Sequence, residues 1–170
     1  MQAHKRYNTM PVTSFLPHPL RALRRWLMAA CLFGAWAAQA QTLANTGGLS
    51  FGSFVAGSGG AIAVTTGGAR SKTGGVMLVA QGGSSAAAQF TVSGTANATY
   101  AITLPANGTV LLSSGSNTMA INSFVSYPSA TGTLSGGGTQ MLSVGATLTV
   151  GNAQVPGSYA GSFTATVNYN

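Results

Sequence analysis

Residues that could carry out chemistry are concentrated at the start of the sequence. The chain has seven Lys and Arg, two His, one Cys and no Asp or Glu. His4, His18 and Cys31 all precede residue 41, so Arg70 and Lys72 are the only ionic side chains beyond it. Acid–base catalysis mostly uses His or a carboxylate, and zinc and calcium sites use Cys, His or carboxylates. The rest of the chain therefore predicts no catalytic residue, no metal site and no cofactor.

One short motif suggests nucleophile chemistry. Lys72-Thr73-Gly74 matches the Lys-Thr-Gly of penicillin-recognising serine enzymes, whose second signature, Ser-x-x-Lys, needs a serine at position 69. Ala69 stands there instead. We interpret Lys72 as an exposed loop lysine beside a glycine turn, and we expect a protein that is not an enzyme.

The positive charge belongs to a leader rather than to a binding surface. The net charge is +7, which by itself suggests a polyanion as partner. Five of the cations fall within the first 25 residues, namely Lys5, Arg6, Arg21, Arg24 and Arg25. The remainder carries only two, so we expect no binding to nucleic acid.

The leader has the three parts of a secretory signal. Arg21–Arg25 ends a positive region, an apolar run spans Trp26 to Ala38, and Ala38-Gln39-Ala40 is a small-x-small cleavage site. The apolar run would rise about 20 Å as a helix, less than the ~30 Å hydrocarbon core, so no permanent membrane span is expected. We predict a signal peptide over 1–40 with cleavage after Ala40, and one exported domain over 41–170.

Two alternatives concern the leader. Met10 is an alternative start to Met1, because the positive region is long. Cys31 is a candidate for lipidation, although the apolar run continues past it to the better Ala-x-Ala site. In either case the sequence predicts export to the periplasm and the cell surface.

The exported part reads as a series of short strands. Val, Ile, Thr, Phe and Tyr recur in short runs between glycine-rich breaks, and no segment has a helical pattern. About nine strands with no helix favour an antiparallel sandwich, with a β-helix as the second choice. The expected strands include 49–52, 62–65, 76–80, 90–93, 100–104, 110–112 and 119–125, and breaks include 66–75 and 107–108.

The clearest strand is the last one. Phe163, Ala165, Val167 and Tyr169 alternate with polar residues, so one face should enter the core, and Tyr159 is expected on the apolar side. The preceding segment, 142–150, alternates in the same way. A turn over 151–157 would join the two into a long antiparallel hairpin.

Two stretches resemble a bacterial secreted family, domain of unknown function 4402. The opening is carried by Leu49-Ser50-Phe51-Gly52, Gly57–Gly60, Ile62-Ala63-Val64, Gly68-Ala69-Arg70 and Gly74-Gly75-Val76. The ending is carried by the run from Gly157 to Tyr169. The resemblance covers nearly all of the exported chain, and its motifs are glycine and aromatic patterns.

The ending is also similar to that of chaperone–usher pilus subunits. Tyr169 is the penultimate residue and Gly157 is fourteenth from the end, counting Asn170 as first. This similarity implies an immunoglobulin-like sandwich that lacks one strand, with a periplasmic chaperone and an outer-membrane usher as partners. The neighbouring subunit would supply the missing strand from its N-terminal segment, and Leu43, Leu49 and Phe51 would be the apolar residues of that donor segment.

The sequence thus predicts a secreted structural subunit of a surface fibre of the fimbrial or pilus type, assembled by self-association. Gly157, Tyr159, Phe163, Ala165, Val167 and Tyr169 would form its core and assembly strand. The alternative is a monomeric extracellular binding module, a lectin-like sandwich that uses exposed Tyr and Asn. A soluble monomer would favour the second reading, and polymerisation would favour the first.

Overall fold

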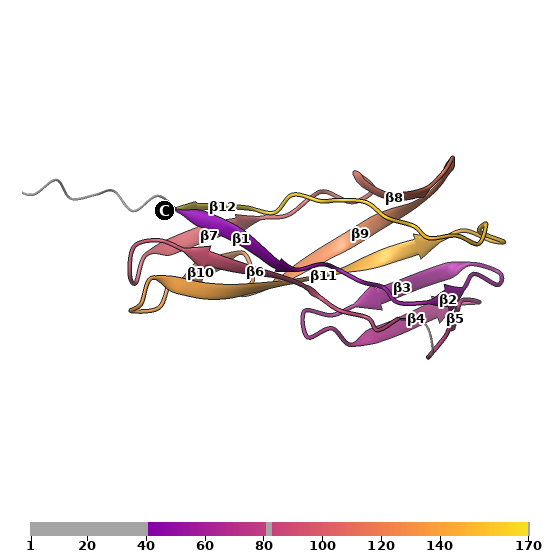
Figure 1. Ribbon diagram of the computed structural model, residues 1–170, viewed down its shortest axis with the longest axis horizontal. Helices are drawn as coiled ribbons and strands as arrows, with labels where there is room; N and C mark the ends of the chain where they lie inside the picture. The colour runs from indigo at the N-terminus through magenta and orange to yellow at the C-terminus, as the bar shows by residue number, and fades with distance from the viewer. Residues whose placement is uncertain (1–40, 81–82, 170) are drawn as a thin grey trace, which may run out of the picture. The chain divides into compact units, whose positions relative to one another are not determined.

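Every regular element in the described part of the chain is a β-strand. The computed structural model describes residues 41–80 and 83–169 (Figure 1). In chain order the strands are β1 (Thr42–Gly47), β2 (Phe54–Val55), β3 (Gly60–Val64), β4 (Arg70–Gly74), β5 (Met77–Leu78), β6 (Ala88–Ser93), β7 (Thr99–Thr103), β8 (Val110–Ser114), β9 (Asn117–Tyr127), β10 (Thr131–Thr133), β11 (Thr139–Val150) and β12 (Thr166–Tyr169).

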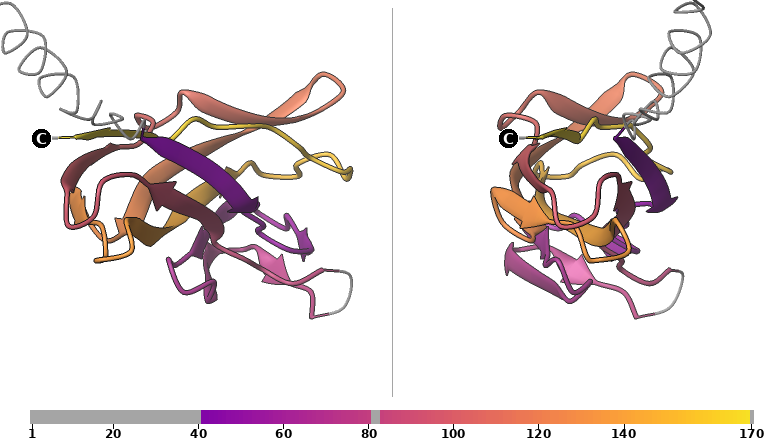
Figure 2. Two further views of the ribbon diagram at one scale, coloured as in Figure 1. Left: turned by 60° about the vertical axis from the view of Figure 1, so that its left-hand side comes forward. Right: turned by 90° about the vertical axis from the view of Figure 1, so that its left-hand side faces the viewer.

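All the ladders between these strands are antiparallel. The prediction of an all-β antiparallel fold is therefore confirmed, and the β-helix alternative is wrong because its strands would pair in parallel. Seven strands form one sheet with the order β1-β6-β11-β3-β4, to which β9 and β8 are added through β11. This sheet curls into a half-barrel (Figure 2). A second sheet has the order β10-β7-β12, and β2 pairs with β5 alone.

Strand β11 runs through the middle of the seven-stranded sheet. Its first half pairs with β6, its second half pairs with β3, and β9 lies along its other side. Alternate side chains of β11 are buried, as the sequence predicts: Leu142, Val144, Ala146, Leu148 and Val150. Because strand side chains alternate between faces, this row forms one continuous apolar surface on the inner side.

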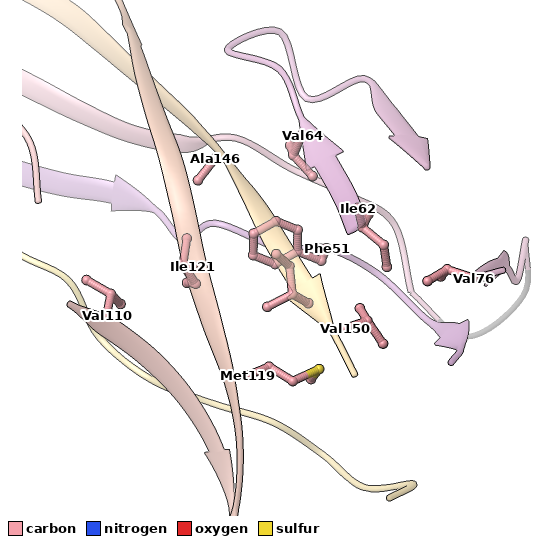
Figure 3. Packing of buried hydrophobic residues seen from close by; sticks show 10 residues of the cluster. Phe51, Ile62, Val64, Val76, Val110, Met119, Ile121, Ala146 and Val150 are labelled. Carbon is pink, nitrogen blue, oxygen red and sulfur yellow. The ribbon is translucent and has the colours of Figure 1, made fainter. Parts of the chain in front are cut away.

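The buried side chains divide into two clusters that share this row. The first core cluster holds Phe51, Ile62, Val64, Val76, Val110, Met119, Ile121, Ala146, Leu148 and Val150 (Figure 3). The second core cluster holds Ala88, Phe90, Val92, Tyr100, Leu134, Leu142, Val144 and Ala165. Leu49, Phe124 and Phe163 are half-buried and pack against both clusters, so they join the two.

The expected hairpin between 142–150 and the last strand does not form. Strand β12 pairs with β7, where Tyr169 lies opposite Tyr100, and β11 pairs with three other strands. Residues 151–165 carry the chain from one sheet to the other. Alternation specifies which face of a strand is buried and leaves its partner open, which explains the error.

Three segments also differ from their predicted structure. The expected break at 66–75 contains β4, and Lys72 lies on this strand opposite Ile62 rather than in a loop. The expected strand at 49–52 forms only an isolated bridge between Ser50 and Ala86. The segment 76–80 contributes only the two residues of β5.

Candidate functional site

Residues 161–165 have the alternation of a strand but belong to no ladder. Ser162 and Thr164 are exposed, whereas Ala165 is buried and Phe163 is half-buried. The Phe163 ring lies 6.1 Å from that of Phe90, edge to face, and 5.2 Å from that of Phe124. The pairing with β7 begins only at Thr166. This segment is therefore placed by its side chains rather than by strand pairing.

Tyr169 fixes the far end of the same segment. Its hydroxyl accepts a hydrogen bond of 3.1 Å from the backbone N–H of Thr95, in the turn after β6. The ring packs so closely on Gly94 that a Cβ there would overlap the hydroxyl. Val167, also on β12, is half-buried and packs against the second core cluster. The predicted core residues of the last strand thus do contact the core.

The N-terminal segment begins at the same turn. In β1, Thr42 lies opposite Ser93 and Leu43 opposite Val92. Leu43 packs against the second core cluster, and Phe51 is 6% exposed within the first. The three residues predicted as a donor segment, Leu43, Leu49 and Phe51, therefore lie in the fold of their own chain when one copy is considered alone.

A groove lies between the two terminal segments at the other end. We call residues 49–57 the N-terminal wall, residues 153–161 the C-terminal wall, and the space between them the seam. The seam holds a groove with a volume of about 880 Å³, and its lining also includes Leu112, Met119 and Leu148. Met119 and Leu148 belong to the first core cluster, as does Phe51 in the N-terminal wall (Figure 3). These three side chains are at most 6% exposed, so the seam borders the hydrophobic core without leaving it open to solvent.

The two walls run in opposite directions along the seam. The backbone N–H of Ala153 donates to the carbonyl of Gly57 over 3.2 Å, which closes one end. From that end one wall runs back to Leu49 and the other runs on to Gly161, next to Phe163, and Leu49 and Phe163 pack against the same two core clusters. A strand added between the walls would therefore be parallel to one and antiparallel to the other.

The walls differ in how firmly they are held. In the N-terminal wall, Ser50 exchanges two backbone hydrogen bonds with Ala86, and the carbonyl of Ser53 accepts from the N–H of Val79. In the C-terminal wall, Tyr159 donates its hydroxyl to the Val155 carbonyl over 2.7 Å. Gln154 also donates to that hydroxyl, and Ala160 forms an isolated bridge with Ser113. The exposed Gly157 lies beside the Ser114 side chain.

Charge is missing from the seam. No residue that the structure places in the lining is ionic, and the only cations of the described ranges, Arg70 and Lys72, lie on β4. The described residues contain no group of His, Cys, Asp or Glu that could hold a metal ion. What the seam offers is apolar surface and backbone hydrogen-bonding groups, which suit an added β-strand.

The family of this chain follows from comparison with known proteins. A family model described as Domain of unknown function (DUF4402) matches residues 42–169. The chain belongs to this family. The DUF4402 match begins at the first residue of β1 and ends at Tyr169, so it includes both walls of the seam. No curated protein and no solved structure matches the chain. These comparisons give no evidence of similarity to chaperone–usher pilins, and that part of the sequence interpretation is not supported.

Predictions about the leader of this DUF4402 protein fall outside the described residues. They comprise the signal peptide over 1–40, the cleavage site at Ala38 and Ala40, the start at Met1 or Met10, and lipidation of Cys31. Within 41–80 and 83–169, the structure contains no helix long and apolar enough to cross a membrane.

Sequence reasoning missed one residue that holds a wall of the seam. Arg70 was noted as a charge and as part of the family pattern, yet its guanidinium donates to three backbone carbonyls, including those of Phe51 and Ser53 in the N-terminal wall. A lone arginine beside glycines, in a chain without any carboxylate, was the available signal. No Asp or Glu side chain is available to pair with such a guanidinium, and backbone carbonyls are acceptors that it can use instead.

Proposed function

We propose that this protein is a non-enzymatic structural subunit of a surface fibre, and that a strand from a second copy fills the seam of the first. One observation carries the proposal. Residues 161–165 alternate like a strand and pack their apolar side chains into the core, but they belong to no ladder, and Gly161 at their start also lines a groove that borders the first core cluster.

A strand fits this seam better than a compact ligand does. The two walls, residues 49–57 and 153–161, border the groove along its length, and the groove follows them rather than forming a closed chamber. An added strand gains backbone hydrogen bonds along its length, while every second side chain enters apolar pockets. Such a strand would complete the core, and its affinity would come largely from buried apolar area.

The residue inventory supports a structural role rather than catalysis. From residue 41 onward the sequence contains no His, Cys, Asp or Glu, so the usual general acids, bases and metal ligands are missing. A subunit without carboxylates also keeps nearly constant stability across acid and neutral pH, because few groups can change their protonation on folding. That property suits a fibre exposed outside the cell.

We further infer an immunoglobulin-like sandwich of the pilin kind, with one strand missing at the seam. A subunit that lacks a strand beside its core is prone to aggregate, so a periplasmic chaperone and an outer-membrane usher are the proposed partners. The leader supports a route through the periplasm to the cell surface, with assembly into a fimbrium by self-association.

The test is to express the full 170-residue sequence with and without its neighbouring periplasmic genes. We expect ladders that resist detergent without boiling, and filaments by electron microscopy. Ser158→Trp places a large ring in the groove from an exposed position, and it should abolish the ladders while circular dichroism stays unchanged. Val125→Trp, at an outward-facing position 49% exposed, is the matched control and should assemble normally.

A second candidate function is a monomeric extracellular binding module. The observation that favours it is a set of exposed side chains on the outer face of β9 and β11, with Val125 49%, Tyr127 72% and Met141 65% exposed. An exposed aromatic ring can stack on a ligand such as a sugar, in the manner of a lectin. A stable monomer under every expression condition would support this function and contradict the fibre.

A further inference from the structure

The side chain of Arg70 connects the N-terminal wall of the seam to other parts of the fold. It opens β4, lies opposite Val64, and projects from the same inner face of the sheet. Its Nη1 donates to the carbonyl of Phe51 over 2.9 Å and to that of Ser53 over 3.0 Å. Its Nη2 donates to the carbonyl of Val79 over 3.0 Å, so one side chain joins the N-terminal wall to the segment after β5.

These contacts use a property that only arginine has. The guanidinium is planar and carries five donors in a fixed fork, whereas the lysine ammonium is a compact point charge on a flexible stem. The sequence contains no carboxylate, so carbonyl dipoles take the place of an ionic partner. Hydrogen bonds with a charged donor are about twice as strong as neutral ones, which makes this a firm attachment.

The wall is shaped around the guanidinium. Gly52 lies between the two acceptor residues with φ of +67°, a conformation that glycine adopts without strain. A Cβ at this position would lie 2.5 Å from Nη1 of Arg70 and 3.0 Å from the carbonyl oxygen of Gly83. The backbone therefore turns closely around the charge, and this turn directs Phe51 into the core and Ser53 into the lining of the groove.

The opposite wall is attached to other strands without a charged donor: Ala160 exchanges two backbone hydrogen bonds with Ser113 of β8, and the Gln154 side chain donates to the Thr118 carbonyl of β9 over 3.3 Å. The bonds of Tyr159 stay within its own segment, to Val155 and Gln154, and the bridge between Ala160 and Ser113 lies near its end. Among the described residues, the N-terminal wall is thus the one held by a charged side chain, which ties it to β4 and to the segment after β5. A preformed wall lowers the ordering cost of binding.

We propose that Arg70 is a positioning residue that holds the N-terminal wall in the shape an incoming strand of a second copy requires. The inference rests on the proposed function, since it assigns a role at the same seam. Arg70 acts through the backbone of residues 51–53 and need not touch the added strand. Its loss should therefore impair assembly well beyond any effect on the folded core.

Two measurements on the exported full chain test this role. Hydrogen exchange reports residues 49–56 and residues 142–148 separately, and the detergent-resistant ladder reports assembly. Arg70→Met should speed exchange of 49–56 at least tenfold, the lower range for losing a hydrogen bond to a charged group, and leave 142–148 within threefold. It should also remove most of the ladder. Arg70→Lys should fall between, and Lys72→Met on the same strand should leave the exchange of residues 49–56 as in the wild type.

The outcomes separate the inference from the proposed function. Unchanged exchange of 49–56 in Arg70→Met would overturn the positioning role, and so would an equal rise in both regions, which marks a general stability effect. Normal ladders despite a loosened wall would also overturn it. If the wild type forms no ladder, the fibre proposal fails, while the exchange measurement still decides whether Arg70 holds the wall.

Discussion

Replacing Phe163 by alanine is the sharpest test of how the ladder-free segment is held. The ring contacts Phe90 and Phe124 at centroid distances of 6.1 Å and 5.2 Å, and it packs against both core clusters. Truncation of a core phenylalanine costs about 3–5 kcal/mol. Because Phe163 is half-buried, we take the lower end and expect a loss of about 3 kcal/mol in the free energy of unfolding.

Urea unfolding followed by far-UV circular dichroism measures this loss. Circular dichroism is preferred to tryptophan fluorescence because Trp26 and Trp36 both lie in the leader. With a urea slope of about 1–3 kcal/mol per molar, a loss of about 3 kcal/mol should lower the midpoint by about 1–3 M. Val125→Ala is the control, because an exposed outward-facing side chain should change stability by less than about 0.5 kcal/mol.

A double-mutant cycle makes the reasoning refutable. Phe124→Ala and Phe163→Ala remove two rings in direct contact, so their combined effect should depart from additivity by about 0.5–1.5 kcal/mol. A loss below about 1 kcal/mol for Phe163→Ala, or strict additivity with Phe124→Ala, would show that the segment is not anchored in the core.

Three further predictions concern other contacts. Burial raises the pKa of Tyr100, whose hydroxyl donates to Gln140. The stability of the fold should therefore be level at lower pH and fall as pH rises above 10.0. Melting curves recorded against pH should show this fall, and Tyr100→Phe should remove it. Gly94→Ala should expel the Tyr169 ring, and adding Tyr169→Ala should cause little further loss in thermal unfolding, whereas additive losses would contradict the packing. Lys72→Val should increase aggregation through the edge strand β4, measured by light scattering, and unchanged scattering would refute a protective role for this charge.

The sequence showed which face of each strand is buried, but it did not show which strands pair with each other. Alternation correctly placed Leu142, Val144 and Leu148 in the core, because the period of two belongs to each strand by itself. It could not show that β11 pairs with β6, β3 and β9 at once, since those contacts join residues far apart in the chain. The hairpin with the last strand failed for this reason.

The sequence predicted only part of the structure around the seam. The alternating run around Phe163 and Val167 indicated a strand, but nothing in it showed that pairing would begin only at Thr166. The role of Arg70 was hidden because its acceptors are backbone carbonyls, which every residue type supplies. Contacts of this kind depend on the path of the chain and not on the identity of the residues that accept.

The placement of charge distinguishes the edges of the sheet. Arg70 and Lys72 lie opposite Val64 and Ile62, so both project from the inner face of the edge strand β4. Inward-pointing charges on an edge oppose the addition of another strand, because they would be buried by it. The walls of the seam carry no ionic side chain, and their exposed apolar side chains, Val55 and Val155, would gain from being covered. If Arg70 and Lys72 protect the β4 edge, the uncharged seam is the place where this domain can accept a strand without burying a charge.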